Sequence, residues 1–384
     1  MMNQSNTAEC KMNGRGFWAL IATQFQGAFN DNAFKVIVVF LLPLMAKDTQ
    51  YPTTAIAFLI FNLPFLMLPS YAGFLADRFS KQRVALFTKY WEVGVMLLGT
   101  VALMLHSISM LWITLFLMAM QSAFFSPAKY GILPEILKEE QLPWGNGILQ
   151  LGTMIAIIAG TAVGAPLVGA FEERAYLAGG VLVVFSAIGT LSAHFISKPQ
   201  AAAPTRTMPL NPWAGLGRCA NCFRKDRMLL LTMLGIAYFW FAGTLSMQNI
   251  IELAKETVDS TALQGQLLTA LSLGIGIGSV AAGFLSRGKI RMELIPAGGF
   301  GLAVLGMGIW GFWGSVVLLF GLGFFGGFFV IPLDAMLQKR SPEDMRGDMI
   351  ATCNFVTFSG MTVSAVLFYL LFNFLGFSTS HIFL

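Results

Sequence analysis

Long apolar stretches are the feature that most constrains the fold of this chain. Eleven of them, each long enough to cross the roughly 30 Å hydrocarbon core of a bilayer, recur along the 384 residues. Only 11% of the residues are charged, against about 25% in soluble domains. Because lipid offers the backbone no hydrogen-bond partners, we expect these stretches to be helices. The sequence therefore predicts an all-α polytopic membrane protein.

A basic and proline-rich segment divides the eleven predicted spans into six and five. The spans cover residues 17–44, 53–75, 84–105, 109–134, 145–170, 176–197, 228–251, 263–286, 293–312, 314–337 and 347–376. The composition of the segment between the sixth and seventh spans indicates a linker. We expect an N-terminal six-helix bundle at 1–197, a cytoplasmic linker at 198–227 and a C-terminal bundle at 228–384.

The distribution of Lys and Arg predicts the orientation of the chain. These residues concentrate in the cytoplasmic loops of membrane proteins. With the N-terminus inside, 18 of the 24 Lys and Arg residues fall in cytoplasmic segments and only three in outer loops. We therefore expect a cytoplasmic N-terminus. Basic residues that meet anionic membrane lipids explain the net charge of +5, so no nucleic-acid partner is expected.

The sequence indicates no metal centre and no catalytic centre. Cys219 and Cys222 form a CxxC pair, but a structural zinc site needs four ligands and no second pair follows. The chain has no HxxxxD motif of the acyltransferase type, no GxSxG nucleophile elbow and no zinc-protease motif. We therefore expect neither a cofactor nor enzymatic activity.

The two halves of the chain carry matching motifs. “GFLADRFSKQR” (Gly73–Arg83) after the second span is matched by “GFLSRGKIR” (Gly283–Arg291) after the eighth. “FFSPAK”, which ends at Lys129, is matched by “FFVIPLD”, which ends at Asp334. Two repeated membrane halves joined by an inner loop are the plan of a transporter with a central site between the halves.

The loop after the second span carries the pattern Gly-x-x-x-Asp-Arg, as Gly73, Asp77 and Arg78, followed by basic residues. In this motif the chain resembles the major facilitator superfamily. The resemblance implies two pseudo-symmetric helical bundles, twelve helices in all, of which this chain shows eleven. It also implies that Asp77 meets the inner end of the eleventh span near Gly347 and holds an inner gate shut.

Polar side chains inside the predicted spans are candidate functional groups, because an ionisable residue at membrane depth costs at least about 2.5 kcal/mol. In “FNDNAFK”, Asp31 lies near the middle of the first span and shares a helical stripe with Gln24 and Lys35. The stripe predicts the wall of a water-filled cavity. The alternative is an internal pair of Asp31 with Lys35.

Three further places in the spans carry charge. Lys129 lies beside Tyr130 in the fourth span and either faces the cavity or extends to the inner interface. Asp334 either binds a cation or closes a gate through an ion pair with the other half, and we favour the ion pair. Lys89 and Glu92, three residues apart, are expected to pair locally, and the alternative is a role in substrate binding.

Five segments together look like the bacterial lysophospholipid transporter branch of the superfamily. They are “FNDNAFK”, “GFLADRFSKQR”, “FFSPAKYGILPEI”, “GNGILQ” and “GGFFVIPLDAMLQ”, and they span both halves. The resemblance implies a flippase that works by alternating access in the bacterial inner membrane. Its substrates would be lysophospholipids, chiefly lysophosphatidylethanolamine and lysophosphatidylglycerol, moved to the inner leaflet for a cytoplasmic acyltransferase, separate or fused.

The resemblance places the acid of the first helix on Asp31 and the amine of the fourth on Lys129. A carboxylate can hold an ethanolamine ammonium and a lysine can hold phosphate. The residues expected to bind a glycerol headgroup are Asn30, Asn32 and Gln24.

Two departures from the branch stand out. The basic residue of the seventh helix is absent around Thr244–Gln248, so phosphate would rest more on Lys129 or Lys35. The twelfth helix is missing, which suggests part of a longer protein, such as the transporter part of a fusion.

The alternative function is that of a proton-coupled drug or sugar transporter in which Asp31 titrates.

Overall fold

The computed structural model describes residues 14–46, 53–171, 174–255, 260–286, 288–311 and 316–378. Over these ranges every regular element is a helix, which confirms the predicted all-α class. Residues 1–13, on which the predicted cytoplasmic N-terminus falls, and 379–384, the end of the predicted C-terminal bundle, lie outside the described residues.

Thirteen α-helices are described, with short 3₁₀ or π turns beside some of them. They are α1 (Gly14–Ala46), α2 (Thr53–Met67), α3 (Pro69–Arg78), α4 (Lys81–Met104), α5 (Ile108–Ile136), α6 (Leu142–Gly169), α7 (Tyr176–Ala193), α8 (Ala214–Lys225), α9 (Arg227–Lys255), α10 (Ser260–Leu285), α11 (Leu294–Gly311), α12 (Val316–Arg340) and α13 (Arg346–Tyr369). Side-chain caps fix some of the starts: the hydroxyl of Ser80 accepts a bond from the backbone N–H of Arg83 at the start of α4, and Ser107 plays the same part for α5.

Not all of the predicted spans are full-length apolar helices. Within the described ranges nine helices are long and apolar enough to cross a membrane, and the bent pair α2–α3 makes a tenth. The apolar stretch of α11, Leu294–Met307, is shorter. The predicted count of eleven spans is therefore not confirmed.

The predicted span 53–75 is in fact two helices, α2 and α3, which meet at an angle of 56°. Pro69 has no N–H to donate and crowds the residue before it. Leu68 accordingly leaves the helical region, with φ −122° and ψ 22°. The break puts Gly73 and Asp77 on a short helix of their own, angled to the span that precedes it.

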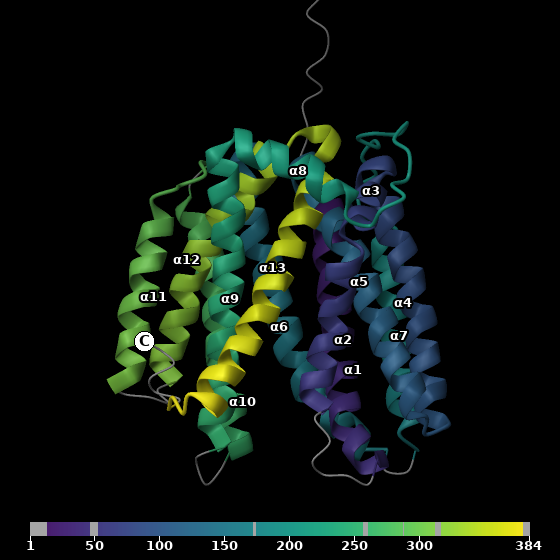
Figure 1. The fold of residues 1–384 in the computed structure, drawn as a ribbon. Helices are drawn as coiled ribbons and strands as arrows, with labels where there is room; N and C mark the ends of the chain where they lie inside the picture. Colours follow the sequence, from purple (N-terminus) through teal and green to yellow (C-terminus); the bar gives the residue numbers. More distant parts are fainter. Residues whose placement is uncertain are drawn as a thin grey trace, which may run out of the picture.

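Figure 1 shows α1, α2, α4, α5 and α7 on one side of the molecule, α9, α11 and α12 on the other, and α8 across one end. We call that end the linker end, and the opposite one the far end. Helix α6 packs against both α1 and α10, and α13 packs against both α9 and α3. The two halves of the chain therefore touch mainly through α6 with α10 and α13 with α3. Further contacts join α12 to α6 and α5, and α13 to α5 and α2.

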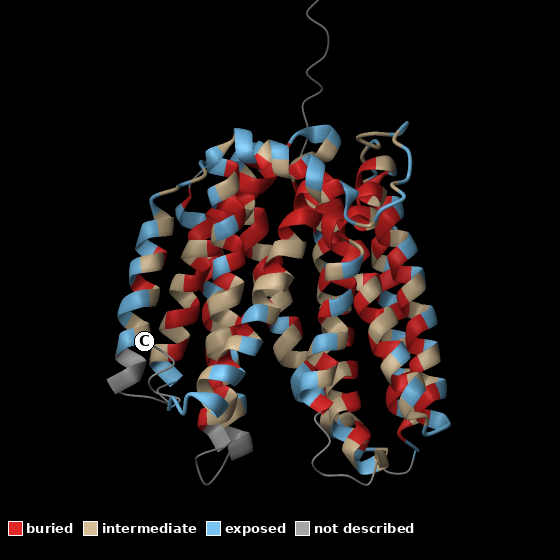
Figure 2. Cartoon of the chain, viewed as in Figure 1, coloured by how far each residue is buried: buried red, intermediate tan, exposed pale blue. Residues whose placement is uncertain are grey.

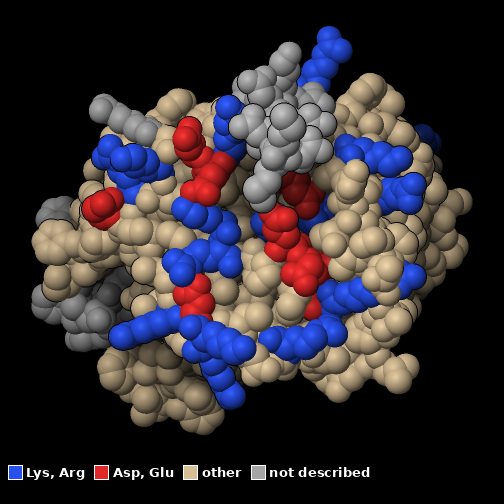
Figure 3. Space-filling model, turned by 90° about the horizontal axis from the view of Figure 1, so that it is seen from above, with Lys and Arg blue, Asp and Glu red and all other residues tan. Residues whose placement is uncertain are grey.

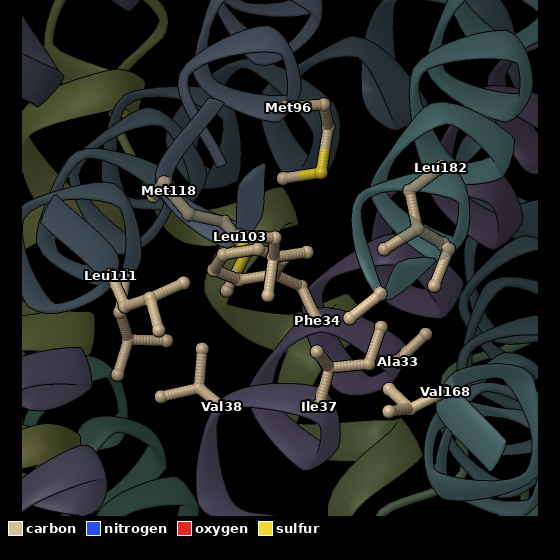
Figure 4. Close-up of a cluster of buried hydrophobic side chains, with 14 of the residues drawn as sticks. Ala33, Phe34, Ile37, Val38, Met96, Leu103, Leu111, Met118, Val168 and Leu182 are labelled. Carbon is tan, nitrogen blue, oxygen red and sulfur yellow. The ribbon is translucent and has the colours of Figure 1, made fainter. Parts of the chain in front are cut away.

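Apolar side chains fill the interior of the first half. Phe34 and Ile37 of α1 pack with Met96 of α4, Met118 of α5 and Leu182 of α7, and all five are buried (Figure 4). The burial of each such side chain contributes about 1.5–3 kcal/mol. This cluster holds α1 at a fixed rotation, and so decides which of its polar residues face the other half.

Burial between the halves is concentrated toward the linker end (Figure 2). In α13 every residue from Arg346 to Cys353 is buried, whereas beyond Cys353 only Thr357, Ser364 and Phe368 are. The charged side chains also gather on the face at the linker end, where Figure 3 shows both acidic and basic groups. The two halves are thus closed against each other at that end.

The predicted linker contains a helix that the sequence analysis missed, α8. It buries Cys219 and Phe223 in a cluster with Leu229 of α9 and Met349 of α13. Burial raises the pKa of the Cys219 thiol to about 12, so this cysteine stays protonated and is a packing residue. The linker is therefore a packed part of the linker end and not only a loop.

Candidate functional site

Asp77 joins the two halves at the linker end. Its side chain is fully buried at the end of α3, where it accepts bonds from the backbone N–H groups of Gly347 (2.6 Å) and Asp348 (3.1 Å). The first N–H groups of a helix lack partners inside the helix and carry partial positive charge. The carboxylate of Asp77 therefore satisfies the start of α13 from the opposite half. Its role in gating stays a prediction.

Two glycines allow this close approach of α3 and α13. A Cβ atom on Gly347 would lie 2.6 Å from the Asp77 carboxylate and 2.7 Å from the carbonyl oxygen of Gly73. A Cβ atom on Gly73 would lie 2.7 Å from the Cα atom of Asp348. Any side chain at either position would push the helices apart. Gly73 and Gly347 therefore allow the contact because they have no side chain.

The linker supplies the cations for this buried acid cluster. Arg206 forms ion pairs with both Asp77 (3.0 Å) and Asp348, and Arg218 adds a bond of 3.0 Å to Asp348. Arg78 in turn donates to the backbone carbonyl of Arg206. We call Asp77, Arg206, Gly347 and Asp348 the linker-end gate. The sequence analysis counted Arg206 only as one of the cytoplasmic basic residues, because nothing in the loop sequence shows which carboxylates it meets.

A second set of polar contacts between the halves joins α6 to α12 at the linker end. The side-chain amides of Asn146 and Gln338, both buried, exchange two hydrogen bonds of 2.9 and 2.8 Å. Lys339 of α12 also pairs with Glu139 of the first half. Polar contacts at the linker end therefore join α3 to α13 and α6 to α12.

Asp31 lies at mid-helix in α1 and is largely buried, with 9% of its surface exposed. The Ser122 hydroxyl of α5 donates to its Oδ2 atom at 2.6 Å, while its Oδ1 atom has no hydrogen-bond partner among the described residues. Lys35 donates instead to Asn32 (3.1 Å) and lies over the ring of Phe61, so the alternative of an Asp31–Lys35 pair is not what the structure shows.

The other polar residues of α1 divide between two environments. Gln24 donates to Thr153 of α6 at 3.0 Å, on the side where α6 runs between the halves. Asn30 is fully buried and donates to Glu92 and to the carbonyl of Leu182, both at 3.1 Å. Asn30 therefore lies inside the first half, and we remove it from the set of expected headgroup ligands.

The predicted pair of Lys89 and Glu92 is confirmed. The two side chains form an ion pair with 0% and 1% of their surfaces exposed, and Gln26 and Asn30 donate to the same carboxylate. This network ties α1 to α4 deep inside the first half. Its place there favours a structural role.

We expect Glu92→Ala to destabilise the protein strongly, because it leaves the Lys89 ammonium buried without its partner. Breaking a buried pair in this way costs about 3–5 kcal/mol, whereas replacing both partners by apolar residues is often close to neutral. Thermal unfolding of the purified protein in detergent should show a much lower Tm for Glu92→Ala than for wild type. The Tm of the double variant Lys89→Met/Glu92→Leu should be lowered less. Equal stability of Glu92→Ala and wild type would contradict the structural role.

Lys129 and Asp334 lie at corresponding positions in the two halves, on α5 and α12. Both are partly exposed, and neither forms a hydrogen bond or an ion pair with any described residue. The Lys129 ammonium lies 4.8 Å from the centre of the Tyr130 ring and interacts electrostatically with Asp31 and Asp334. The ion pair that we expected to link Asp334 to the other half is therefore not formed in the described structure.

Comparison with known proteins identifies the family. The profile of the Major Facilitator Superfamily matches residues 25–365. The chain belongs to the Major Facilitator Superfamily. Its membership, its apolar helices and its two contacting halves make it a multi-pass membrane protein.

Curated members of the Major Facilitator Superfamily that resemble the chain are named as lysophospholipid transporters. The lysophospholipid transporter LplT of Cronobacter sakazakii is 30% identical over 362 residues, which cover 92% of this chain and 88% of the relative. The LplT protein of Yersinia enterocolitica is 31% identical over 368 residues, covering 92% and 86%. The chain thus matches these transporters over most of their length.

Solved structures of the Major Facilitator Superfamily share the fold. The fucose:proton symporter FucP, in an outward conformation, superposes with a TM-score of 0.75 at 15% identity, covering 96% of this chain and 94% of FucP. The human organic anion transporter MFSD10 gives a TM-score of 0.76 at 12% identity, covering 96% and 97%. At these identities the likeness establishes the architecture alone.

Proposed function

We propose that this chain is a lysophospholipid transporter that moves single-chain phospholipids across the membrane by alternating access. The observation that carries the proposal is the pair formed by Asp31 and Lys129. Among the described residues, Asp31 has one carboxylate oxygen without a hydrogen-bond partner, and the ammonium of Lys129 forms no hydrogen bond or ion pair. Both lie within the membrane spans of a chain about 30% identical to lysophospholipid transporters. Opposite charges that are only partly satisfied at this depth suit a zwitterionic headgroup.

The residues of the proposed headgroup site lie along α1 and α5. Asp31 would bind the ammonium of lysophosphatidylethanolamine and Lys129 its phosphate, with Tyr130 beneath the ammonium of Lys129. Asn32, Lys35 and Gln24 would bind the polar groups of lysophosphatidylglycerol. Asp77 belongs to the linker-end gate, and Gly73 and Arg78 would support it through their contacts with Asp348 and Arg206.

We further propose that the linker end is cytoplasmic, in the inner membrane of a bacterium, and that the N-terminus lies on the same side. The concentration of Lys and Arg in the segments at that end supports this orientation. Transport would then run from the outer to the inner leaflet, where a cytoplasmic acyltransferase, separate or fused, would restore the second chain. The protein itself would carry out no chemistry. We propose residues 198–227 as the boundary between bundles at 1–197 and 228–384.

Direct binding separates this function from that of a proton-coupled drug or sugar carrier. Purified protein in detergent is incubated with radiolabelled lysophosphatidylethanolamine and with unlabelled competitors. We expect unlabelled lysophospholipids to displace the label, and sugars or cationic drugs at the same concentration to leave it bound. Displacement by a sugar or a drug, with none by lysophospholipid, would contradict the proposal.

A further inference from the structure

Asp334 is the one partly exposed position in an otherwise buried stretch of α12, from Val330 to Gln338. The same pattern recurs in α5, where Lys129 and Tyr130 alone are not buried between Ala123 and Leu133. A charged residue is the last type expected at the accessible position of a helix packed in a membrane protein, unless a polar group meets it there.

The two partly exposed positions lie on helices of opposite halves that contact each other, α5 and α12, and Tyr130 packs in one cluster with Leu333 of α12 and Cys353 of α13. The groups that act electrostatically on Asp334 or feel its charge are Lys129 and Tyr130 of α5 and Cys353 of α13. All three belong to helices at the interface between the halves. Asp334 is therefore turned toward that interface and away from the lipid.

The charges of Lys129 and Asp334 are close enough to interact but are not in contact. No ion pair joins them among the described residues, although each is desolvated by its surroundings. An ammonium and a carboxylate held apart in this way leave room for a group that carries both charges. A phosphate would then meet Lys129 and an ammonium would meet Asp334.

Asp31 cannot take the role of a carboxylate that meets the headgroup from the second half, whereas Asp334 can. Asp31 lies in the same half as Lys129 and already accepts a bond from Ser122, which lies seven residues before Lys129 on α5, or about 10 Å along the helix axis. Within the described helices α9 to α13, Asp334 is the one acidic or basic residue that lies well inside an apolar span and away from its ends. Among the described residues, Asp334 is thus the charged group that the second half offers to a headgroup bound between the halves.

We propose that Asp334 is a headgroup-binding residue that selects zwitterionic over anionic lysophospholipids. This inference rests on the proposed function. Asp31 holds the ammonium at mid-depth, and Asp334 holds it nearer the linker end, while the phosphate of the same headgroup binds Lys129. An anionic lysophosphatidylglycerol keeps the bond to Lys129, gains nothing from the carboxylate of Asp334 and is repelled by it.

The test compares two substrates in one assay. Wild type, Asp334→Asn and Asp334→Glu are reconstituted in liposomes, and the inward transfer of radiolabelled lysophosphatidylethanolamine and lysophosphatidylglycerol is measured. Loss of one charge-assisted bond predicts a fall of about tenfold or more for lysophosphatidylethanolamine with Asp334→Asn. Lysophosphatidylglycerol transfer should stay the same or rise, and Asp334→Glu should keep the wild-type preference.

Three outcomes overturn the inference. If Asp334→Asn reduces the transfer of both lipids equally, Asp334 is a gating or structural residue. If it changes the transfer of neither lipid, Asp334 has no part in binding. Wild-type protein that transfers neither lipid would refute the proposed function itself, which distinguishes the two failures.

A competition on wild type tests the inference without any variant. Lysophosphatidylcholine, which carries a quaternary ammonium, should inhibit lysophosphatidylethanolamine transfer more strongly than lysophosphatidic acid, which has none. The reverse order, or equal inhibition, would contradict a carboxylate that selects for the cation.

Discussion

Lys129→Ala is expected to reduce the uptake of lysophosphatidylethanolamine at least about thirtyfold, while the protein remains folded and inserted. The ammonium of Lys129 lies over the ring of Tyr130 but forms no hydrogen bond or ion pair with any described residue, so its loss leaves no ion-pair partner behind. The phosphate of the substrate, in contrast, loses its cation in a desolvated site. Truncating one side of a buried charge pair costs about 2–5 kcal/mol, which is about 30-fold to several thousandfold in binding.

The measurement is uptake of radiolabelled lysophosphatidylethanolamine by spheroplasts that express each variant at equal levels. Lys138→Ala is the matched control, because Lys138 is exposed and lies just beyond the end of the same helix. It should transport as wild type does. Asp31→Asn should also reduce the uptake of lysophosphatidylethanolamine. If both site variants keep wild-type uptake, the proposed headgroup site is wrong.

Asp77→Ala is expected to open the linker end and so to stop transport by a different route. The substitution removes the acceptor for two backbone N–H groups of α13 and one of the two carboxylates that hold Arg206. Loss of a helix cap costs about 1 kcal/mol and loss of a buried ion pair about 3–5 kcal/mol. A shift of that size changes the ratio of closed to open molecules by more than about a hundredfold.

Alkylation of Cys353 reports on the opening. Cys353 is buried at the interface just beyond the linker-end gate, so it can be kept as the one reactive thiol after Cys10, Cys219 and Cys222 are replaced by Ser. Asp77→Ala should speed its alkylation about tenfold or more. Arg218→Gln is the matched control: Arg218 is 47% exposed and Asp348 keeps Arg206, so the rate should barely change. Equal rates for Asp77→Ala and wild type would refute the gate.

Much of the architecture could be predicted from the sequence because the membrane simplifies it. Apolar stretches of fixed length predicted the all-α class. The family resemblance carried by Gly73 and Asp77 implied the contact of Asp77 with Gly347 that the structure contains. A helical stripe placed Asp31 and Gln24 on a side of α1 that contacts other helices of the transporter. These features depend on local periodicity or on a short motif.

What the sequence did not predict depends on contacts between distant segments. Asn30 is adjacent to Asp31 but lies about 100° away around the helix, and only the packing of Phe34 and Ile37 shows that it faces Glu92. Arg206 belongs to a segment without periodicity, so its pairing with Asp77 could not be foreseen. The break at Leu68 had a visible cause in Pro69, but the sequence alone did not show that the chain would turn there.

Inward transfer in a purified system tests the central claim most directly. The protein is reconstituted in liposomes, radiolabelled lysophosphatidylethanolamine is added to the outer leaflet, and albumin then extracts whatever has stayed there. The account predicts a time-dependent, albumin-resistant pool with wild type and almost none with Lys129→Ala. A wild-type pool no larger than that of protein-free liposomes would contradict the account.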